Sequence, residues 1–343
     1  PSADTPMIAS NLIPLGAPQV EQQEQEMIEE SKAATIQSEC CKGHAAITSF
    51  DDMMEVSNYK SWPGIKEEWP RDYQRALHKI YAKALRRAAN AVTKSSAPWV
   101  VKSRNVEAGD AMLIISEMNL EGLSTDIFDE SFDSIKGTMR ESGIDAMEDV
   151  LNRVQGVEIS FDIDNATTLD AVKGSANRIA QREPVEVAKA VERAVAKNIS
   201  VGGTVAELAQ TFQSMASDSA GSWSTHKSEM VARTETMIAK NEGRQQAWKQ
   251  SKVVRGKKFL IAPGACDFCK AVEKQMGGEV MLDATFNGDV SELEAEDGKV
   301  YKFGTYRAFT TPPVHPNCRC TMEPVTFSDD EIADQIFDEL ELD

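Results

Sequence analysis

The chain has 343 residues, and its 55 acidic side chains outnumber its 37 basic ones, which gives a formal net charge of −18. This length predicts two or three compact units. So large an acidic excess excludes a general nucleic-acid coat, although a local basic patch remains compatible with phosphate contact. No stretch approaches the roughly 20 uninterrupted apolar residues of a membrane-spanning helix, and the first residues lack the layout of a signal peptide. We therefore expect a soluble protein with no membrane segment.

Residues 1–58 contain four prolines, a run of glutamate and glutamine, and few aromatic residues. Such a segment buries too little apolar surface to offset the entropy lost on ordering it. We predict a flexible polar arm that serves for attachment. Cys40, Cys41 and His44 lie within it, and because adjacent cysteines constrain metal geometry poorly, we interpret them as free thiols in preference to a metal site.

A long helix is predicted from Arg71 to Lys94, because apolar residues recur there at spacings of three and four. A basic residue at every fourth position forms a stripe beside the apolar face. The members of this basic stripe are Arg71, Arg75, Lys79, Lys83 and Arg87. One interpretation of the stripe is an ordinary solvated face. The other is a contact surface for DNA or for an acidic partner.

Residues 100–155 have a helical pattern with an interruption at Gly122. Residues 157–163 then alternate apolar and polar side chains, which is typical of a half-buried strand. An extended linker is the alternative, so residues 156–165 form our candidate domain boundary.

The helical pattern is stronger from residue 167 to residue 250. Gly202 and Gly203 are expected to end one helix. Thr204 and Glu207 have the spacing of a capping box, which predicts the start of the next helix.

Two segments near the C-terminus have the composition of a metal site. Their candidate donors are Cys266 and Cys269 on a Gly-containing turn after a predicted strand, and His315, Cys318 and Cys320 after 45 intervening residues. Thiolates and imidazole favour tetrahedral zinc over magnesium or calcium. These five candidates outnumber the four ligand positions of a tetrahedral zinc site. Because side chains alternate in an extended Cys-x-Cys segment, we expect only one of Cys318 and Cys320 to bind the metal.

A redox dithiol at Cys266 and Cys269 is an alternative, but the βαβ pattern that usually surrounds one is missing. Disulfide pairing among the four cysteines in an oxidising setting is another. A catalytic zinc needs a nearby acid or base, and neither His-Glu-x-x-His nor His-x-Glu occurs. We therefore expect a structural zinc site and no catalytic residues.

Several of these motifs, taken in order, resemble the phage head morphogenesis domain of tailed bacteriophages, which is related to the Mu F-like proteins. They are the helical sequence VARTET at residues 231–236, residues 241–248 after it, the Cys266 and Cys269 pair, and the sequence PPVHPNCRC at residues 312–320. The resemblance covers about residues 165–325. It implies a helix motif at Arg233, Thr234 and Glu235, and metal ligation by Cys266, Cys269, His315, Cys318 and Cys320.

The resemblance further implies a minor head protein with a structural and assembly role, and not an enzyme. Its expected partners are the portal protein and the major capsid protein, with packaged DNA as a further candidate. It would be present in several copies in the capsid interior or at the portal vertex of the virion, be in the host cytoplasm during assembly, and be ejected with the DNA. Two alternatives are a zinc-dependent hydrolase or nuclease, and an effector delivered with the genome. We also hypothesise that Glu235 pairs with Arg319 and clamps the long helix to the Cys-rich loop.

The predicted fold is mainly α, with a small α+β zinc-knuckle module near the C-terminus. We expect a flexible arm, a helical N-terminal domain, a head-morphogenesis domain containing the metal module, and an acidic C-terminal helix. The corresponding residue ranges are 1–58, 59–160, 161–327 with the module at 256–327, and 328–343.

Overall fold

The computed structural model describes residues 71–94, 105–154, 157–219, 221–286, 292–294, 298, 300–302, 309–328 and 331–332. The predicted arm, with Cys40, Cys41 and His44, lies outside the described residues. Most of the predicted C-terminal helix does too. Its expected start is present, because the Glu331 backbone N–H donates to Ser328 Oγ at 3.3 Å in a capping box.

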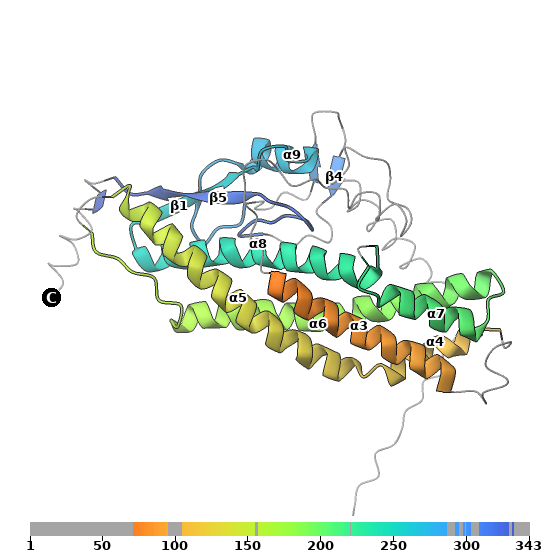
Figure 1. The fold of residues 1–343 in the computed structure, drawn as a ribbon. Coiled ribbons are helices and arrows are strands. Elements are labelled where there is room, and N and C mark those ends of the chain that lie inside the picture. The colour runs from red at the N-terminus through yellow and green to blue at the C-terminus, as the bar shows by residue number, and fades with distance from the viewer. Residues whose placement is uncertain are drawn as a thin grey trace, which may run out of the picture. The chain divides into compact units, whose positions relative to one another are not determined.

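The described residues form a mainly helical fold, as predicted. The helices are α3 (Arg71–Lys94), α4 (Ala108–Glu117), α5 (Leu120–Leu151), α6 (Ala166–Ser200), α7 (Val205–Met215), α8 (Trp223–Ser251) and α9 (Asp267–Met276). The long helix α5 packs along both α6 and α8, and α3 packs against α5, α7 and α8 (Figure 1). The predicted domain boundary at residues 156–165 therefore lies between two helices that are in contact, and the domain division stays a prediction.

Helix α3 has the predicted bounds, because its apolar positions give it one continuous face for the core. Tyr73, Leu77, Tyr81 and Leu85 are all buried on this face. The Tyr73 hydroxyl lies 2.8 Å from Ser131 Oγ of α5, so a polar contact accompanies the apolar packing.

Helix α6 continues through Pro184, although proline usually interrupts a helix because it lacks a backbone N–H. The carbonyl of Ala180, four residues earlier, loses its helical donor for this reason. The Ser124 hydroxyl of α5 donates to that carbonyl at 2.9 Å. The carbonyl that Pro184 leaves without a helical donor thus forms a contact between α5 and α6.

The turn between α6 and α7 has the predicted chemistry. Helix α6 ends just before Gly202, whose φ of 66° is readily adopted only by glycine. The capping box is confirmed: the Glu207 backbone N–H donates to Thr204 Oγ1 at 3.3 Å, and the Thr204 backbone N–H donates to the Glu207 carboxylate at 2.7 Å.

Residues 157–163 form no strand, so the strand interpretation is wrong, and the extended linker stays a prediction. Among the strands in the described part of the chain, none pairs with this segment. A side chain of α8 satisfies part of its backbone instead: Gln250 Nε2 donates to Asp162 O at 2.9 Å, and Gln250 Oε1 accepts from Asp162 N at 2.8 Å.

The predicted interruption at Gly122 is displaced by three residues. Gly122 lies in the first turn of α5, and the break between α4 and α5 falls at Met118 and Asn119. Asn119 adopts a left-handed conformation with φ 54° and its side chain accepts from Gly122 N. Asparagine tolerates this conformation and caps the helix, so the break occurs there and not at the glycine.

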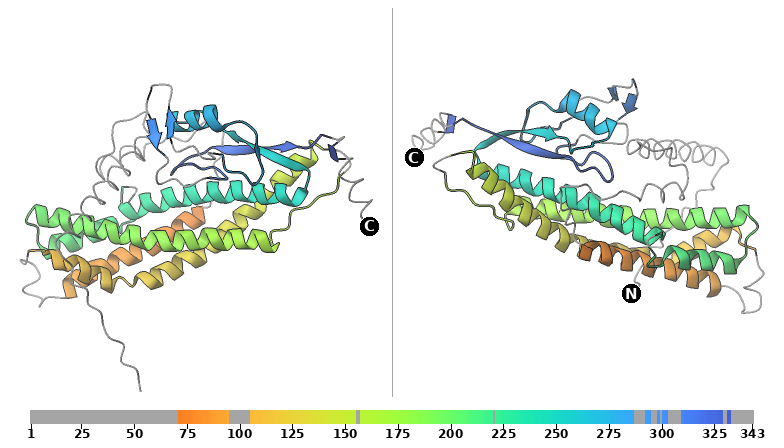
Figure 2. Two further views of the ribbon diagram at one scale, coloured as in Figure 1. Left: turned by 180° about the vertical axis from the view of Figure 1, so that it is seen from behind. Right: turned by 45° about the horizontal axis from the view of Figure 1, so that its top comes forward.

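A small antiparallel sheet follows α8. Its strands are β1 (Val254–Leu260), β2 (Val280–Met281) and β5 (Thr321–Thr326), in the order β2-β1-β5, and β3 (Glu292–Glu294) pairs with β4 (Val300–Lys302) separately. The sheet lies between α8 on one side and α9 on the other (Figures 1 and 2). The strand predicted after α8 is therefore present. Its antiparallel partner β5 follows the segment from His315 to Cys320 in the sequence.

Candidate metal centre

The pairing of β1 with β5 explains how two distant segments meet. Leu260, at the end of β1, lies opposite Thr321, at the start of β5. The chain that leaves β1 and the chain that enters β5 therefore occupy the same end of the sheet. Cys266 and Cys269 follow β1, at the N-terminus of α9, while the segment from His315 to Cys320 immediately precedes β5.

All five predicted donors come together at this place. Cys266 Sγ and Cys269 Sγ lie 3.3 Å and 3.1 Å from His315 Nε2, and Cys269 Sγ lies 3.7 Å from Cys318 Sγ. The donors form two groups that share Cys269, one with Cys266 and His315 and one with Cys318 and Cys320, and within each group the donor atoms lie within 4.8 Å of one another. This Cys/His cluster could hold a metal ion.

Both Cys318 and Cys320 lie in the cluster, and the expectation that only one of them binds the metal stays a prediction. The chain turns immediately before this pair of cysteines. Asn317 has a left-handed φ of 59°, and Cys318 N donates to His315 O at 3.1 Å, so the chain turns before it enters β5. Alternation of side chains applies only to a continuous strand, and β5 begins after Cys320.

The orientation of His315 suits a metal ligand. Its Nδ1 lies 2.8 Å from the carbonyl oxygen of Pro316, which can only accept, so Nδ1 carries the proton. The lone pair of the neutral imidazole is then on Nε2, the atom that faces Cys266 and Cys269. The ring itself is buried.

The close spacing of the thiols separates their pKa values. Hydrogen bonds with Cys266 and Cys318 raise the pKa of Cys269 above its usual range. The hydrogen bond from Cys269 lowers the pKa of Cys318, in spite of the burial of that thiol. Neighbouring thiols cannot all ionise together unless a cation neutralises them, so this donor set is suited to a divalent or soft metal ion.

The three residues of the helix motif in α8 have different partners. Thr234 Oγ1 accepts from Asn317 N at 3.1 Å, which joins the helix to the Cys/His loop. Arg233 Nη2 pairs with Glu229 one turn earlier at 2.9 Å. Glu235 is buried and faces α6.

The hypothesised pair between Glu235 and Arg319 is wrong. Glu235 Oε1 accepts from Arg182 Nη2 at 2.9 Å, and Glu235 Oε2 lies 3.6 Å from Arg178 Nη2. Both arginines are on α6. A residue next to Thr234 on a helix points about 100° away from it, and this rotation directs Glu235 toward the helical core.

Asn241 belongs to the 241–248 segment of the resemblance, but the sequence did not predict its contacts with the Cys/His loop. It is fully buried, and its amide nitrogen donates to Pro312 O at 3.1 Å and to Cys320 O at 3.3 Å. Its amide oxygen accepts from Thr321 Oγ1 at 2.8 Å. Asn241 follows Thr234 by seven residues, which is about two helical turns. This spacing could have predicted that both side chains lie on one face of the helix.

The basic stripe of α3 lies beside acidic residues. Arg75 pairs with Asp72, and Lys83 Nζ lies 3.0 Å from Asp126 Oδ2 of α5. A shallow pocket there is lined by Lys79, Ile80, Lys83, Asp126, Asp129 and Glu130. The local positive charge of the stripe is therefore partly neutralised, and its role as a contact surface for DNA or an acidic partner stays a prediction.

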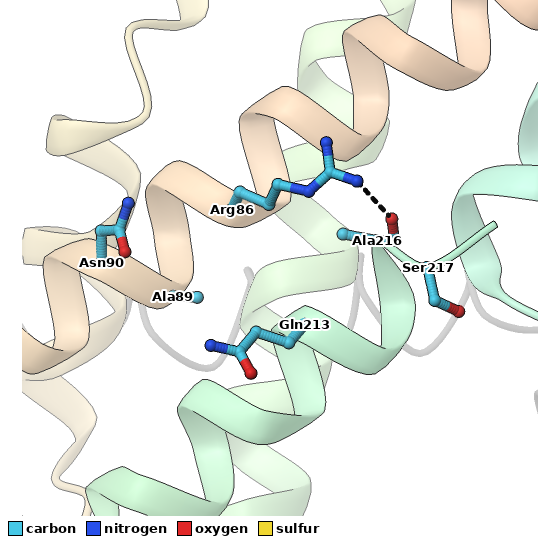
Figure 3. Close-up of a pocket in the computed structure, with 6 residues that line it drawn as sticks. All are labelled: Arg86, Ala89, Asn90, Gln213, Ala216 and Ser217. Carbon is cyan, nitrogen blue, oxygen red and sulfur yellow. Dashed lines mark hydrogen bonds between the residues drawn. The ribbon is translucent and has the colours of Figure 1, made fainter.

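A second surface pocket, of about 380 Å³, lies between α3 and the end of α7 (Figure 3). It is lined by Arg86, Ala89, Asn90, Gln213, Ala216 and Ser217. Arg86 reaches across it and donates to Ala216 O at 3.4 Å. The lining contains no thiol, carboxylate or imidazole, so this pocket offers neither a metal site nor a general base.

None of the helices in the described ranges combines the length and the apolarity needed to cross a membrane. No protein-family model, curated protein or solved structure matches this chain. Membership of the phage head morphogenesis family therefore stays a prediction from the motifs.

Proposed function

We propose that the protein is a structural and assembly component of a tailed-phage head, in which a zinc ion bound by the Cys/His cluster fastens the C-terminal module. We call this proposed zinc site the metal clasp. The observation that supports it is the convergence of five soft donors from two segments 45 residues apart. The phage role rests on the ordered motifs. In this role the chain associates with the portal and capsid proteins, and the basic stripe contacts packaged DNA or an acidic partner.

The dimensions of the cluster support zinc. Zinc bonds of about 2.3 Å to sulfur and about 2.1 Å to nitrogen place tetrahedral donor atoms roughly 3.5 to 3.8 Å apart. The separation of 3.7 Å between Cys269 Sγ and Cys318 Sγ lies in this range, and the two distances to His315 Nε2, 3.1 and 3.3 Å, are slightly shorter. A sulfur-rich donor set also favours zinc over magnesium or calcium.

The arrangement supports a structural site more than the zinc-dependent hydrolase. A catalytic zinc keeps one coordination position open for water. Here five protein donors compete for four positions, and all of them except the half-buried Cys266 are buried. Water therefore has no reserved place in the cluster. In a closed site of this kind the metal-binding free energy contributes directly to folding.

The metal clasp is tested by zinc content and thermal unfolding of the purified chain. We expect about one zinc per chain, and a large fall in Tm after removal by a strong chelator that is reversed when zinc is restored. The control is the Cys266→Ser, Cys318→Ser double variant, which should show no response to the chelator. A chain free of metal, or a Tm unaffected by chelation, would contradict the clasp.

The phage role needs a separate experiment. The full chain should be co-expressed with the portal protein and the major capsid protein encoded by the same phage, and the assemblies separated on a density gradient. We expect the chain to sediment with assemblies that contain the portal. A chain that remains with unassembled protein under all these conditions would reject the phage role and leave the metal clasp standing.

A further inference from the structure

We propose that Asn241 is a positioning residue for the metal centre, which holds the segment from His315 to Cys320 in its metal-binding geometry from outside the donor set. This inference rests on the proposed zinc clasp and assigns one side chain of α8 a role in it.

Helix α8 holds this segment at three places along one side. Thr234 accepts from the backbone of Asn317, Asn241 bonds Pro312, Cys320 and Thr321, and Arg244 Nη1 donates to Thr321 Oγ1. In the sequence, Pro312 precedes the donors of this segment, Asn317 lies between His315 and Cys318, and Thr321 follows Cys320. The turn that brings Cys318 and Cys320 to the same place is thus held at each end by a helix that is itself part of the core.

Asn241 makes the most complete of these contacts. Its side chain is 0 % exposed, and both its amide groups are used: the nitrogen donates to two loop carbonyls and the oxygen accepts a loop hydroxyl. One of the two carbonyls belongs to Cys320, a donor residue of the cluster. A side chain bonded to the backbone of a ligand fixes where that ligand's sulfur lies, as outer-shell partners of metal sites do.

The two halves of the cluster are positioned by different elements. Cys266 is the N-cap residue of α9 and Cys269 lies in its first turn, and α9 packs on β1 and β3. The other half is bonded by α8, although the His315 ring also contacts Phe268 of α9. Zinc affinity therefore depends on how well each half is ordered before the ion binds, and Asn241 supplies that order for the second half.

The test compares zinc affinity among variants of the full chain. Asn241→Ala removes all the contacts, whereas Asn241→Asp keeps the acceptor for Thr321 and loses both donors. The matched control is Gln250→Ala, because Gln250 also lies on α8 and bonds backbone groups, but those groups belong to Asp162, far along the chain from the cluster. Zinc Kd is measured by competition with a chromophoric chelator at fixed pH, and Tm is measured with and without zinc.

We expect both Asn241 variants to bind zinc about 10- to 100-fold more weakly than the wild type, the usual effect of losing an outer-shell partner. Gln250→Ala should lower Tm and leave the zinc Kd unchanged. If an Asn241 variant does not fold, Thr234→Val serves in its place. It loses the acceptor for Asn317 N and a donor to Met230 O within α8, and it should weaken zinc binding several-fold.

Asn241 variants with the Kd of the wild type would overturn the inference even if their Tm falls, because a purely structural residue lowers Tm in the zinc-bound and zinc-free chain alike. That result would leave the zinc clasp intact. A wild-type chain that binds no zinc would instead reject the clasp and this inference together.

Discussion

A carboxylate that is fully buried in a helical core needs partners, and Glu183 has three. Its oxygens accept from Tyr81 Oη at 3.0 Å and from Arg182 Nε at 2.8 Å, and lie 3.2 Å from Lys227 Nζ. Arg182 also bonds Glu235, so these residues connect α3, α6 and α8. We call the five residues, of which Arg182 is partly exposed at the edge, the buried ionic group.

The charges of the buried ionic group set its response to pH. Burial alone would raise the pKa of Glu183, but Lys227 and Arg182 outweigh it and hold the pKa below the usual value of 4.5. Because the folded-state pKa is the lower one, the ionised carboxylate stabilises the fold above the unfolded-state pKa. This contribution is lost as the pH falls through the folded-state pKa.

The substitution Lys227→Met should lower the free energy of unfolding at pH 7 by about 3 to 5 kcal/mol, because it leaves a buried carboxylate without one of its cations. The loss relative to the wild type should be smaller at pH values below the folded-state pKa of Glu183, where the carboxylate is neutral in both proteins. Urea unfolding followed by circular dichroism at several pH values measures both effects.

The control is Lys189→Met. Lys189 Nζ lies 3.6 Å from Glu186 in a pair that is 45 % and 34 % exposed, and such pairs contribute about 0 to 1 kcal/mol. Equal losses for the two variants, or a Lys227→Met loss that does not change with pH, would show that the buried ionic group is not coupled as described.

At the level of elements, α5 and α8 lie in close contact at Gly243. A Cβ atom on this residue would lie 2.3 Å from Ser142 Oγ and 2.6 Å from the Met139 carbonyl oxygen. Since the second neighbour is backbone, the two helices would have to move apart. The absence of a side chain at this position therefore sets their separation.

We predict that Gly243→Ala lowers the free energy of unfolding by about 1 to 3 kcal/mol, as overpacking of a core typically does. The matched variant is Gly174→Ala on α6, where nothing lies within 4 Å of the added atom. Alanine is the better helix former, so Gly174→Ala should stabilise the fold by about 0.5 to 1 kcal/mol. Chemical denaturation measures the change in the free energy of unfolding for each variant. The prediction requires a decrease for Gly243→Ala and an increase for Gly174→Ala.

The elements that the sequence predicts well are those with local causes. The apolar period of α3 and the pair Thr204 and Glu207 act over three or four residues, so both are recognisable without the fold. Asn119 and Gly122 show the limit. Both residue types end helices, and only the tertiary path decides which one does so here.

The partners of individual side chains are not local, and they were not predictable. Glu235 looks like an exposed charge next to Arg233, yet α6 supplies its partners from more than 50 residues away in the sequence. The inclusion of Cys320 in the cluster depends on a left-handed Asn317 that no pattern of apolar residues reveals. The five donors themselves were predictable, because their residue types and spacing are unusual.

At the scale of the whole molecule, the net charge of −18 opposes contact with DNA, so any such contact must be local. The basic stripe is the best candidate. Arg75 and Lys83 already pair with Asp72 and Asp126. Neutralisation of part of the stripe lowers the number of phosphates that it can contact.

If the stripe contacts DNA, log Kd should depend linearly on log salt concentration. Five phosphate contacts would give a slope of about 4.5 in magnitude, and three contacts about 2.7. We expect the smaller value, measured by fluorescence anisotropy with a short duplex between about 50 and 200 mM salt. The Arg71→Glu, Lys79→Glu variant should lose the binding. No binding at low salt, or binding that ignores salt, would leave the stripe as a solvated face.

The opposition of Leu260 and Thr321 makes the chain between them a closed loop, joined once in the sheet and again at the cluster. The entropy of closing a loop grows only with the logarithm of its length, so doubling the length costs about 0.6 kcal/mol. The connection between β3 and β4 should accordingly accept an inserted tag or small domain with little loss of stability, whereas the short turns beside the donors should accept none. Length variation in this protein is therefore best tolerated in the interior of the loop, whereas the metal-binding residues at its two ends restrict both length and sequence.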